Sequence, residues 1–217
     1  GDPELMTLKA VRVLERCPVI AAPRTKSGEM LALEIASGAA DLGGKTVLPL
    51  DFSMERDRAK QRASHRAAAD LVEPYLAKGL DVAMLNLGDV SIYATYVYLM
   101  EILGEQGYET VMVPGVPSFC AVAARLGVSL TEMNSPLHIA PGGMALDEVL
   151  DQPGTKVLMK SGRQMPAVLD ALAARDALGK SMLVQNCGLP EETVYADLSQ
   201  SRPEGKHGYF STVIVKE

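Results

Sequence analysis

The segment NLGDVSIYATYVYL, which begins at Asn86, contains an acidic residue and three tyrosines and directly follows a short apolar run. Asp89 at such a position can hold a cationic or hydroxyl-bearing ligand, or it can cap the helix that follows, and the residues alone leave both roles open. Tyr93 and Tyr96 are three residues apart and share a helix face, whereas Tyr98 points elsewhere. Packing in the core is a simpler role for Tyr98 than for Tyr93, which lies nearer the strand end.

Turns that contain glycine recur where predicted strands end. They are LGDVS at 87–91, VPGVPS at 113–118 and NCGLP at 186–190. Glycine lets the backbone approach a ligand, and the start of the following helix supplies free N–H groups. One such turn would be ordinary, but three on the same predicted edge favour a small-molecule cleft. Nucleotide phosphates are not the predicted ligand, because neither GxxxxGK(S/T) nor GxGxxG occurs.

Two basic residues, Arg24 and Lys26, follow another predicted strand in the segment APRTKSG. A solvated loop is their ordinary role, although the two charges could hold a polycarboxylate substrate. The three histidines are isolated and none has a partner at metal-ligand spacing. No GxSxG elbow occurs either. The sequence therefore predicts no protein-bound metal and no hydrolase triad.

Composition narrows the class of protein. The 217 residues carry 27 acidic and 21 basic side chains, for a net charge of −6, and the basic residues form no runs. This balance argues against a nucleic-acid partner. Three widely spaced cysteines argue for a reducing compartment and against a disulfide or zinc framework. No apolar run is long enough to span a bilayer and no leader opens the sequence, so we expect a cytoplasmic protein with no membrane partner.

Helical and strand-like periodicities alternate in the first half of the chain. This order predicts β-α-β units and a mostly parallel sheet, whose ligands bind at the carboxyl ends of the strands. The expected strands are 19–22, 46–50, 82–87 and 110–113, and the expected helices are 8–16, 29–36, 56–76, 93–103 and one that opens at 118.

The turn-forming segment TEMNSP at 131–136 interrupts this alternation, and we interpret it as a linker between domains 1–134 and 135–217. Several strands of the second half follow one another without a helix, which predicts a mixed or antiparallel sheet. The expected strands are 137–140, 156–160, 181–185, 193–196 and 209–216, with helices at 145–150 and 164–174. The predicted fold class is therefore α/β in two domains.

Taken together, these segments resemble the tetrapyrrole (precorrin and corrin) methyltransferases that use S-adenosylmethionine (SAM). The opening GDPELMTLKA is similar to that family's GxGPGDPxLLTLKA, LNLGDVSIYATYVYL to its GDPxxY segment, VPGVPSFCAVAARLGVSL to its PGxSSxxAAAAxxGxPL, and YFSTVIVK to its closing strand. The form GDVSIYATY, with Val90 where the family usually has proline, and the segment APRTKSGEMLALEIA are similar to the branch that methylates C(20) of precorrin-2 or cobalt-factor II. The family's leading strand and GxGP element have no counterpart before Gly1, which we interpret as a truncation.

The resemblance implies a two-domain tetrapyrrole methylase-like fold, with SAM in the cleft between the domains, the tetrapyrrole in a trough beside it, and a homodimer. It also implies methyl transfer to C(20), with Asp89 as the candidate base and with Arg24, Lys26 and Tyr93 facing the substrate. The implied SAM contacts, carried over by position, are Leu87, Gly88, Asp89, Ser91, Ile92, Ser118, Phe119, Met159, Asn186, Cys187, Ser211 and Thr212.

Other functions stay open at this point. A related enzyme could methylate C(11) or C(17) of a later precorrin, or diphthamide on a protein, and product regiochemistry separates these reactions. A non-catalytic protein that holds a nucleotide or a tetrapyrrole at the same strand tips is the alternative from another class. SAM binding without turnover on any precorrin would favour that alternative.

Overall fold

The computed structural model describes residues 1–53, 55, 57–143, 145–205 and 208–217. Its contacts divide the chain into two compact units, Asp2–Pro117 (the N-terminal unit) and Ser118–Glu217 together with Gly1 (the C-terminal unit). The boundary expected after residue 134 lies within the C-terminal unit, because helix α5 (Ser118–Leu126) contacts strand β8 (Ser211–Val215). The cleft expected between the domains stays a prediction.

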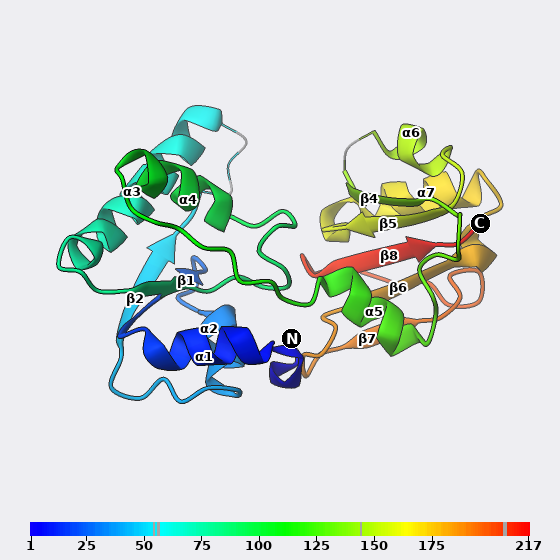
Figure 1. Cartoon of the computed structure of the whole chain (residues 1–217). Helices are drawn as coiled ribbons and strands as arrows, with labels where there is room; N and C mark the ends of the chain where they lie inside the picture. The colour runs from blue at the N-terminus through cyan, green and yellow to red at the C-terminus, as the bar shows by residue number, and fades with distance from the viewer. Residues whose placement is uncertain (54, 56, 144, 206–207) are drawn as a thin grey trace. The chain divides into compact units, whose positions relative to one another are not determined.

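A three-stranded sheet forms the centre of the N-terminal unit (Figure 1). The strand order is β2-β1-β3, and β1 pairs in parallel with both neighbours. The parallel sheet predicted from the alternating pattern is confirmed. The strands are β1 (Val19–Arg24), β2 (Thr46–Asp51) and β3 (Val82–Met84), and the helices are η1 (Pro3–Leu5, 3-10), α1 (Leu8–Arg16), α2 (Leu31–Ser37), α3 (Arg58–Leu76) and α4 (Tyr96–Glu105).

Helices cover both faces of this sheet because successive side chains of β1 point to opposite sides. Ile20 and Ala22 belong to an apolar cluster with residues of α1 and α2, whereas Ala21 belongs to a second cluster with residues of α3 and α4. Side-chain caps begin two of the α-helices: Thr7 Oγ1 accepts from the backbone of α1, and Asp57 accepts two backbone N–H groups of α3. Residue 56, the expected start of α3, lies outside the described residues.

The C-terminal unit is built on a five-stranded mixed sheet in the order β4-β5-β8-β6-β7. Strands β4 and β5 are parallel and the other pairs are antiparallel, as the succession of strands predicted. Leu158, Leu183 and Val213 of the sheet share an apolar cluster with Met165 and Leu172 of helix α7. The remaining bounds are β4 (Leu137–Pro141), α6 (Leu146–Leu150), β5 (Thr155–Met159), η2 (Gly162–Gln164, 3-10), α7 (Met165–Ala173), η3 (Leu178–Lys180, 3-10), β6 (Ser181–Gln185) and β7 (Thr193–Tyr195).

Three elements of the first half differ from expectation, and the first is β3, which ends at Met84 rather than at residue 87. Residues 110–113 form no strand in the structure, and the side chains of Val111 and Met112 are exposed rather than part of a sheet core. The helix expected from residue 93 begins at Tyr96. It starts late because Tyr93 has φ 51°, a left-handed conformation that a right-handed helix cannot contain. Among the described helices, none is both long and apolar enough to cross a bilayer.

Candidate functional site

The Asp89 carboxylate ties together two of the glycine-containing turns in the N-terminal unit. Ser91 donates to Asp89 Oδ1 from its backbone N–H (2.8 Å) and from its hydroxyl (2.5 Å), and the N–H of Gly115 donates to Oδ2 (2.8 Å). These donors, the Ser91 hydroxyl first, hold the pKa of the Asp89 carboxyl below its usual range. A carboxylate stabilised in this way is a weak base, so the geometry favours a positioning role. The assignment of Asp89 as the base stays a prediction.

The backbones of the same two turns are in close contact. A Cβ placed on Gly115 would lie 2.3 Å from the carbonyl oxygen of Gly88, so only glycine fits at position 115. Within the described part of the chain, the backbone N–H groups of Leu87 and Gly88 donate no hydrogen bond to protein, and both residues are exposed. The end of β3 therefore presents two free donors on a backbone that Asp89 and Gly115 hold in place.

Asp89 does not cap α4, because the N-cap is Thr95, so the capping role considered for Asp89 is wrong.

The burial of the three nearby tyrosines also differs from expectation. Tyr98 was expected in the core, yet its side chain is as exposed as that of Tyr93, at 46% each. Tyr96 is the more enclosed residue, and its hydroxyl donates to the carbonyl of Val111 at 3.0 Å. Of the three, Tyr93 stays the predicted substrate contact.

Arg24 and Lys26 differ in how their charges are compensated. Arg24 makes a bidentate ion pair with Asp51, with Nε–Oδ1 at 3.0 Å and Nη2–Oδ2 at 2.6 Å. The two residues are register partners at the ends of β1 and β2. Lys26 lies exposed in a turn that the Thr25 N–H to Glu29 carbonyl hydrogen bond closes, and its amino group pairs with no described residue. The free charge at this edge is therefore that of Lys26.

Three predicted cofactor contacts of the C-terminal unit converge at one end of its sheet. Met159 ends β5, Asn186 follows β6, and Ser211 begins the antiparallel β8. The N–H of Asn186 donates to the Phe210 carbonyl, and the N–H of Ser161 donates to the Ser211 carbonyl. Alternating strand direction thus brings residues more than 50 positions apart to one edge.

Burial separates these residues into enclosed and accessible ones. The side chains of Met159, Ser211 and Thr212 are 8%, 0% and 6% exposed. Asn186 and Cys187 are half-buried, so a ligand at this end would meet them first. Burial raises the pKa of the Cys187 thiol, which keeps it protonated.

Ser118 and Phe119 begin α5. Ser118 is partly exposed, whereas Phe119 is 6% exposed and packs inside the unit. In the N-terminal unit, Ser91 is exposed and Ile92 is half-buried, with its N–H bonded to the Asp89 carbonyl. Each of these assignments as a cofactor contact stays a prediction.

Strained backbone marks the same end of the C-terminal sheet. Asn186 and Lys160 have φ values of 52° and 56°, and each directly follows the end of a strand. Non-glycine residues in this region cost free energy and cluster at functional sites. Asn186 was predicted from the NCG turn, whereas Lys160 was missed although Ser161 and Gly162, which follow it, are a turn signal of the same kind. Lys160 Nζ lies 5.6 Å from the ring centroid of Tyr209.

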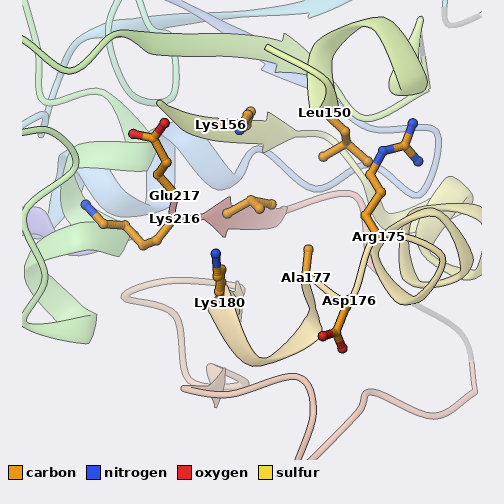
Figure 2. Close-up of a pocket in the computed structure, with 9 residues that line it drawn as sticks. Leu150, Lys156, Arg175, Asp176, Ala177, Lys180, Lys216 and Glu217 are labelled. Atoms are coloured by element: carbon orange, nitrogen blue, oxygen red, sulfur yellow. The ribbon is translucent and has the colours of Figure 1, made fainter. Parts of the chain in front are cut away.

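A pocket of about 200 Å³ lies at the opposite end of this sheet (Figure 2). Its lining includes Lys156 and Val215, which are register partners near the start of β5 and the end of β8. Lys180 and Lys216 also line it. The predicted contacts Met159 and Ser211 occupy the other ends of these two strands, so this pocket is separate from them. No cluster of three His, Cys, Asp or Glu residues suited to a metal occurs among the described residues.

A model of one protein family matches most of the chain. The family is described as Tetrapyrrole (Corrin/Porphyrin) Methylases, and the match covers residues 1–201. The "Probable cobalt-precorrin-2 C(20)-methyltransferase" of Methanocaldococcus jannaschii is 30% identical over 217 residues, which span 100% of this chain and 92% of that protein. The precorrin-2 C(20)-methyltransferase of a Sinorhizobium species is 29% identical over 228 residues, which span 99% and 91%.

Solved structures show the same fold. The uroporphyrin-III C-methyltransferase of Thermus thermophilus, solved in complex with S-adenyl homocysteine, superposes with a TM-score of 0.70. The alignment covers 100% of this chain and 93% of that one, at 20% identity. The predicted tetrapyrrole methylase-like fold is confirmed.

Proposed function

Because the chain belongs to the tetrapyrrole (corrin/porphyrin) methylases, we propose that it transfers a methyl group from SAM to C(20) of precorrin-2 or cobalt-factor II in cobalamin biosynthesis. The observation that carries this proposal is the similarity, over the whole chain, to two proteins named as C(20)-methyltransferases. One of them is named for the cobalt-containing substrate and the other for the metal-free one, at nearly equal identity. Both rings are therefore candidate substrates.

The strand ends fit SAM in kind. Leu87 and Gly88 offer free backbone N–H groups on a turn held by Asp89, and Gly115 leaves no side chain in their way. Such donors suit the carboxylate and hydroxyl groups of SAM. In the C-terminal unit, considered by itself, the half-buried Asn186 has an amide side chain whose Nδ2 donates to the Glu191 carbonyl and whose oxygen is an acceptor. When bound, SAM supplies an electrophilic methyl group on a sulfonium.

The contribution of the protein is mainly positioning. A fixed turn at Gly88 and Asp89 orients the methyl donor, and the exposed Lys26 and Tyr93 are available to the acidic ring. Holding two reactants close to the geometry of attack can be worth about 7–11 kcal/mol of barrier. The substrate carries its own nucleophilic carbon, so the remaining task is removal of one proton. Asp89 is ionised and accepts three hydrogen bonds, which suits it better to holding the turn than to taking that proton.

Product analysis tests the proposal. The protein is incubated with SAM labelled with carbon-13 at its methyl group and, in parallel, with precorrin-2 and cobalt-factor II. We expect mass spectrometry to show one added methyl and carbon-13 NMR to place it at C(20). A methyl at C(11) or C(17) would assign the chain to another branch. Calorimetric SAM binding without transfer to any precorrin would favour the non-catalytic alternative.

We also propose that the protein works as a cytoplasmic homodimer. The family resemblance supports the dimer, and three cysteines without a disulfide suit a reducing compartment. Light scattering after size exclusion should give twice the chain mass of 23.1 kDa. Recovery of the chain from the membrane fraction of cells, or the mass of a monomer, would contradict the corresponding part.

A further inference from the structure

A groove between α3 and α4 is lined by more basic than acidic side chains. It has a volume of about 780 Å³ and lies wholly within the N-terminal unit, where the two helices lie side by side (Figure 1). We call it the arginine groove. The lining residues that bear on its chemistry are Arg58, Arg62, His65, Arg66, Tyr98 and Glu101.

Three arginines follow one another along a single face of α3. Arg58, Arg62 and Arg66 are spaced by four residues, so their side chains project in one direction at intervals of about 6 Å. Their guanidinium groups make no hydrogen bond or ion pair with any described residue, whereas Arg24, Arg125 and Arg175 are all paired. A single acidic residue among those described, Glu101, lines the groove. The groove is therefore strongly cationic.

His65 adds a buried polar group that faces this charge. Its side chain is 8% exposed and its ring stacks on Tyr98, with centroids 4.1 Å apart and planes inclined by 8°. The ring nitrogens have no hydrogen-bond partner among the described residues. His65 itself lines the groove, so a ligand held there would meet its imidazole ring. A flat, half-exposed tyrosine beside a hydrogen-bonding imidazole can receive a planar ligand that carries polar groups.

The groove lies toward the edge of the sheet where the candidate site is found. α3 follows the carboxyl end of β2, and α4 follows the turn that holds Asp89. The N-terminal halves of both helices, which hold Arg58, Arg62 and Tyr98, are thus on the side of the carboxyl ends of the strands.

We propose that the arginine groove binds carboxylate side chains at the rim of the tetrapyrrole substrate. This inference rests on the proposed function and extends substrate recognition from the strand tips to the α3–α4 face. Guanidinium groups recognise carboxylates in bidentate geometry, and three of them at intervals of about 6 Å match a ring that carries several acidic arms. The exposed face of Tyr98 provides the apolar contact for the ring itself.

Binding of an octacarboxylic porphyrin, uroporphyrin, tests the inference without turnover. Fluorescence titration in the absence of SAM should show that the triple variant Arg58→Gln/Arg62→Gln/Arg66→Gln binds at least tenfold more weakly than the unaltered chain. Glutamine has a helix propensity close to that of arginine, so α3 should persist, and circular dichroism checks this. Arg12→Gln is the control, because Arg12 is an exposed arginine of α1 without a partner among the described residues.

The outcomes separate the inference from the proposed function. Weaker porphyrin binding in the triple variant alone, together with a raised KM and a nearly unchanged kcat for methyl transfer, supports the groove. An unchanged porphyrin affinity, an equal loss in Arg12→Gln, or no porphyrin binding by the unaltered chain overturns it. Methyl transfer to C(20) by the unaltered chain is measured separately, and its absence would overturn the proposed function whatever the porphyrin titration shows.

Discussion

Gly115 provides the sharpest test of how the candidate site is held. Its backbone N–H donates to Asp89 Oδ2 at 2.8 Å, and its Cα lies against the carbonyl of Gly88. An alanine Cβ at this position would lie 2.3 Å from that oxygen, inside the 3.0 Å that real Cβ atoms keep from their neighbours. The Gly88 carbonyl belongs to the backbone, which cannot swing aside as a side chain can. Gly115→Ala must therefore separate the two turns.

The size of the effect follows from the two contacts. Overpacking costs about 1–3 kcal/mol, and the hydrogen bond to a charged acceptor contributes roughly 1.5–3 kcal/mol. The turns are at the surface and relax in part, so we expect the free energy of unfolding to fall by about 2 kcal/mol. For a chain of this length, that corresponds to a Tm lower by about 4–8 °C. Because the free N–H groups of Leu87 and Gly88 move with the turn, SAM affinity should fall at least tenfold, or about 1.4 kcal/mol.

Calorimetry measures both quantities. Scanning calorimetry gives Tm and isothermal titration gives the Kd for SAM. Gly104→Ala is the matched control, because nothing lies within 4 Å of a Cβ there and the residue is inside α4. Alanine should stabilise that helix by about 0.5–1 kcal/mol and leave SAM binding unchanged. The reasoning is refuted if Gly115→Ala retains the Tm and the SAM affinity of the unaltered chain.

Three further predictions concern single residues. Asp89→Ala releases the turn that the carboxylate holds, so methyl transfer should fall by at least about 100-fold while circular dichroism shows the fold retained, and turnover at the unaltered rate would remove Asp89 from the mechanism. Burial lowers the pKa of His65, so the unfolded chain binds a proton first as the pH falls through about 6.5. Urea titrations should thus show a lower free energy of unfolding at pH 5.5 than at pH 7.5, a difference that His65→Phe should reduce. Asn186→Ala should cost about 1 kcal/mol in the same assay because φ is 52°, whereas Asn186→Gly should not.

The sequence predicted the sheets because their signals are local and repeated. Buried strands such as 19–24 and 181–185 are short, mostly apolar runs bounded by turn formers, and the order of strands and helices distinguishes parallel from antiparallel pairing. The strand expected at 110–113 had the same composition. A strand also needs a neighbour to pair with, and that requirement is not local. The late start of α4 could not be predicted either, because the composition around Tyr93 does not indicate its left-handed backbone conformation.

The candidate site was predicted only in part, because its local turns have sequence signals and its long-range contacts do not. The glycine turns were placed at strand ends, and the structure brings two of them together through Asp89 and Gly115. The partner of Asp89 is 26 residues further along the chain. Nothing in the sequence states that contact. The ion pair of Arg24 with Asp51 could have been inferred from the register of two parallel strands. The arginine groove was missed because basic residues were sought in runs, whereas a helix groups residues four apart.

In each unit, the conformation of the backbone decides which groups are exposed to a ligand. In the N-terminal unit, the close approach of Gly88 and Gly115 leaves N–H groups as the exposed donors. In the C-terminal unit, the side chains of Met159 and Ser211 are enclosed, and the strain at Asn186 sets where the chain turns after β6. Recognition by backbone depends on conformation rather than on residue type. It therefore tolerates changes such as valine for proline after Asp89, provided that the turn itself is kept.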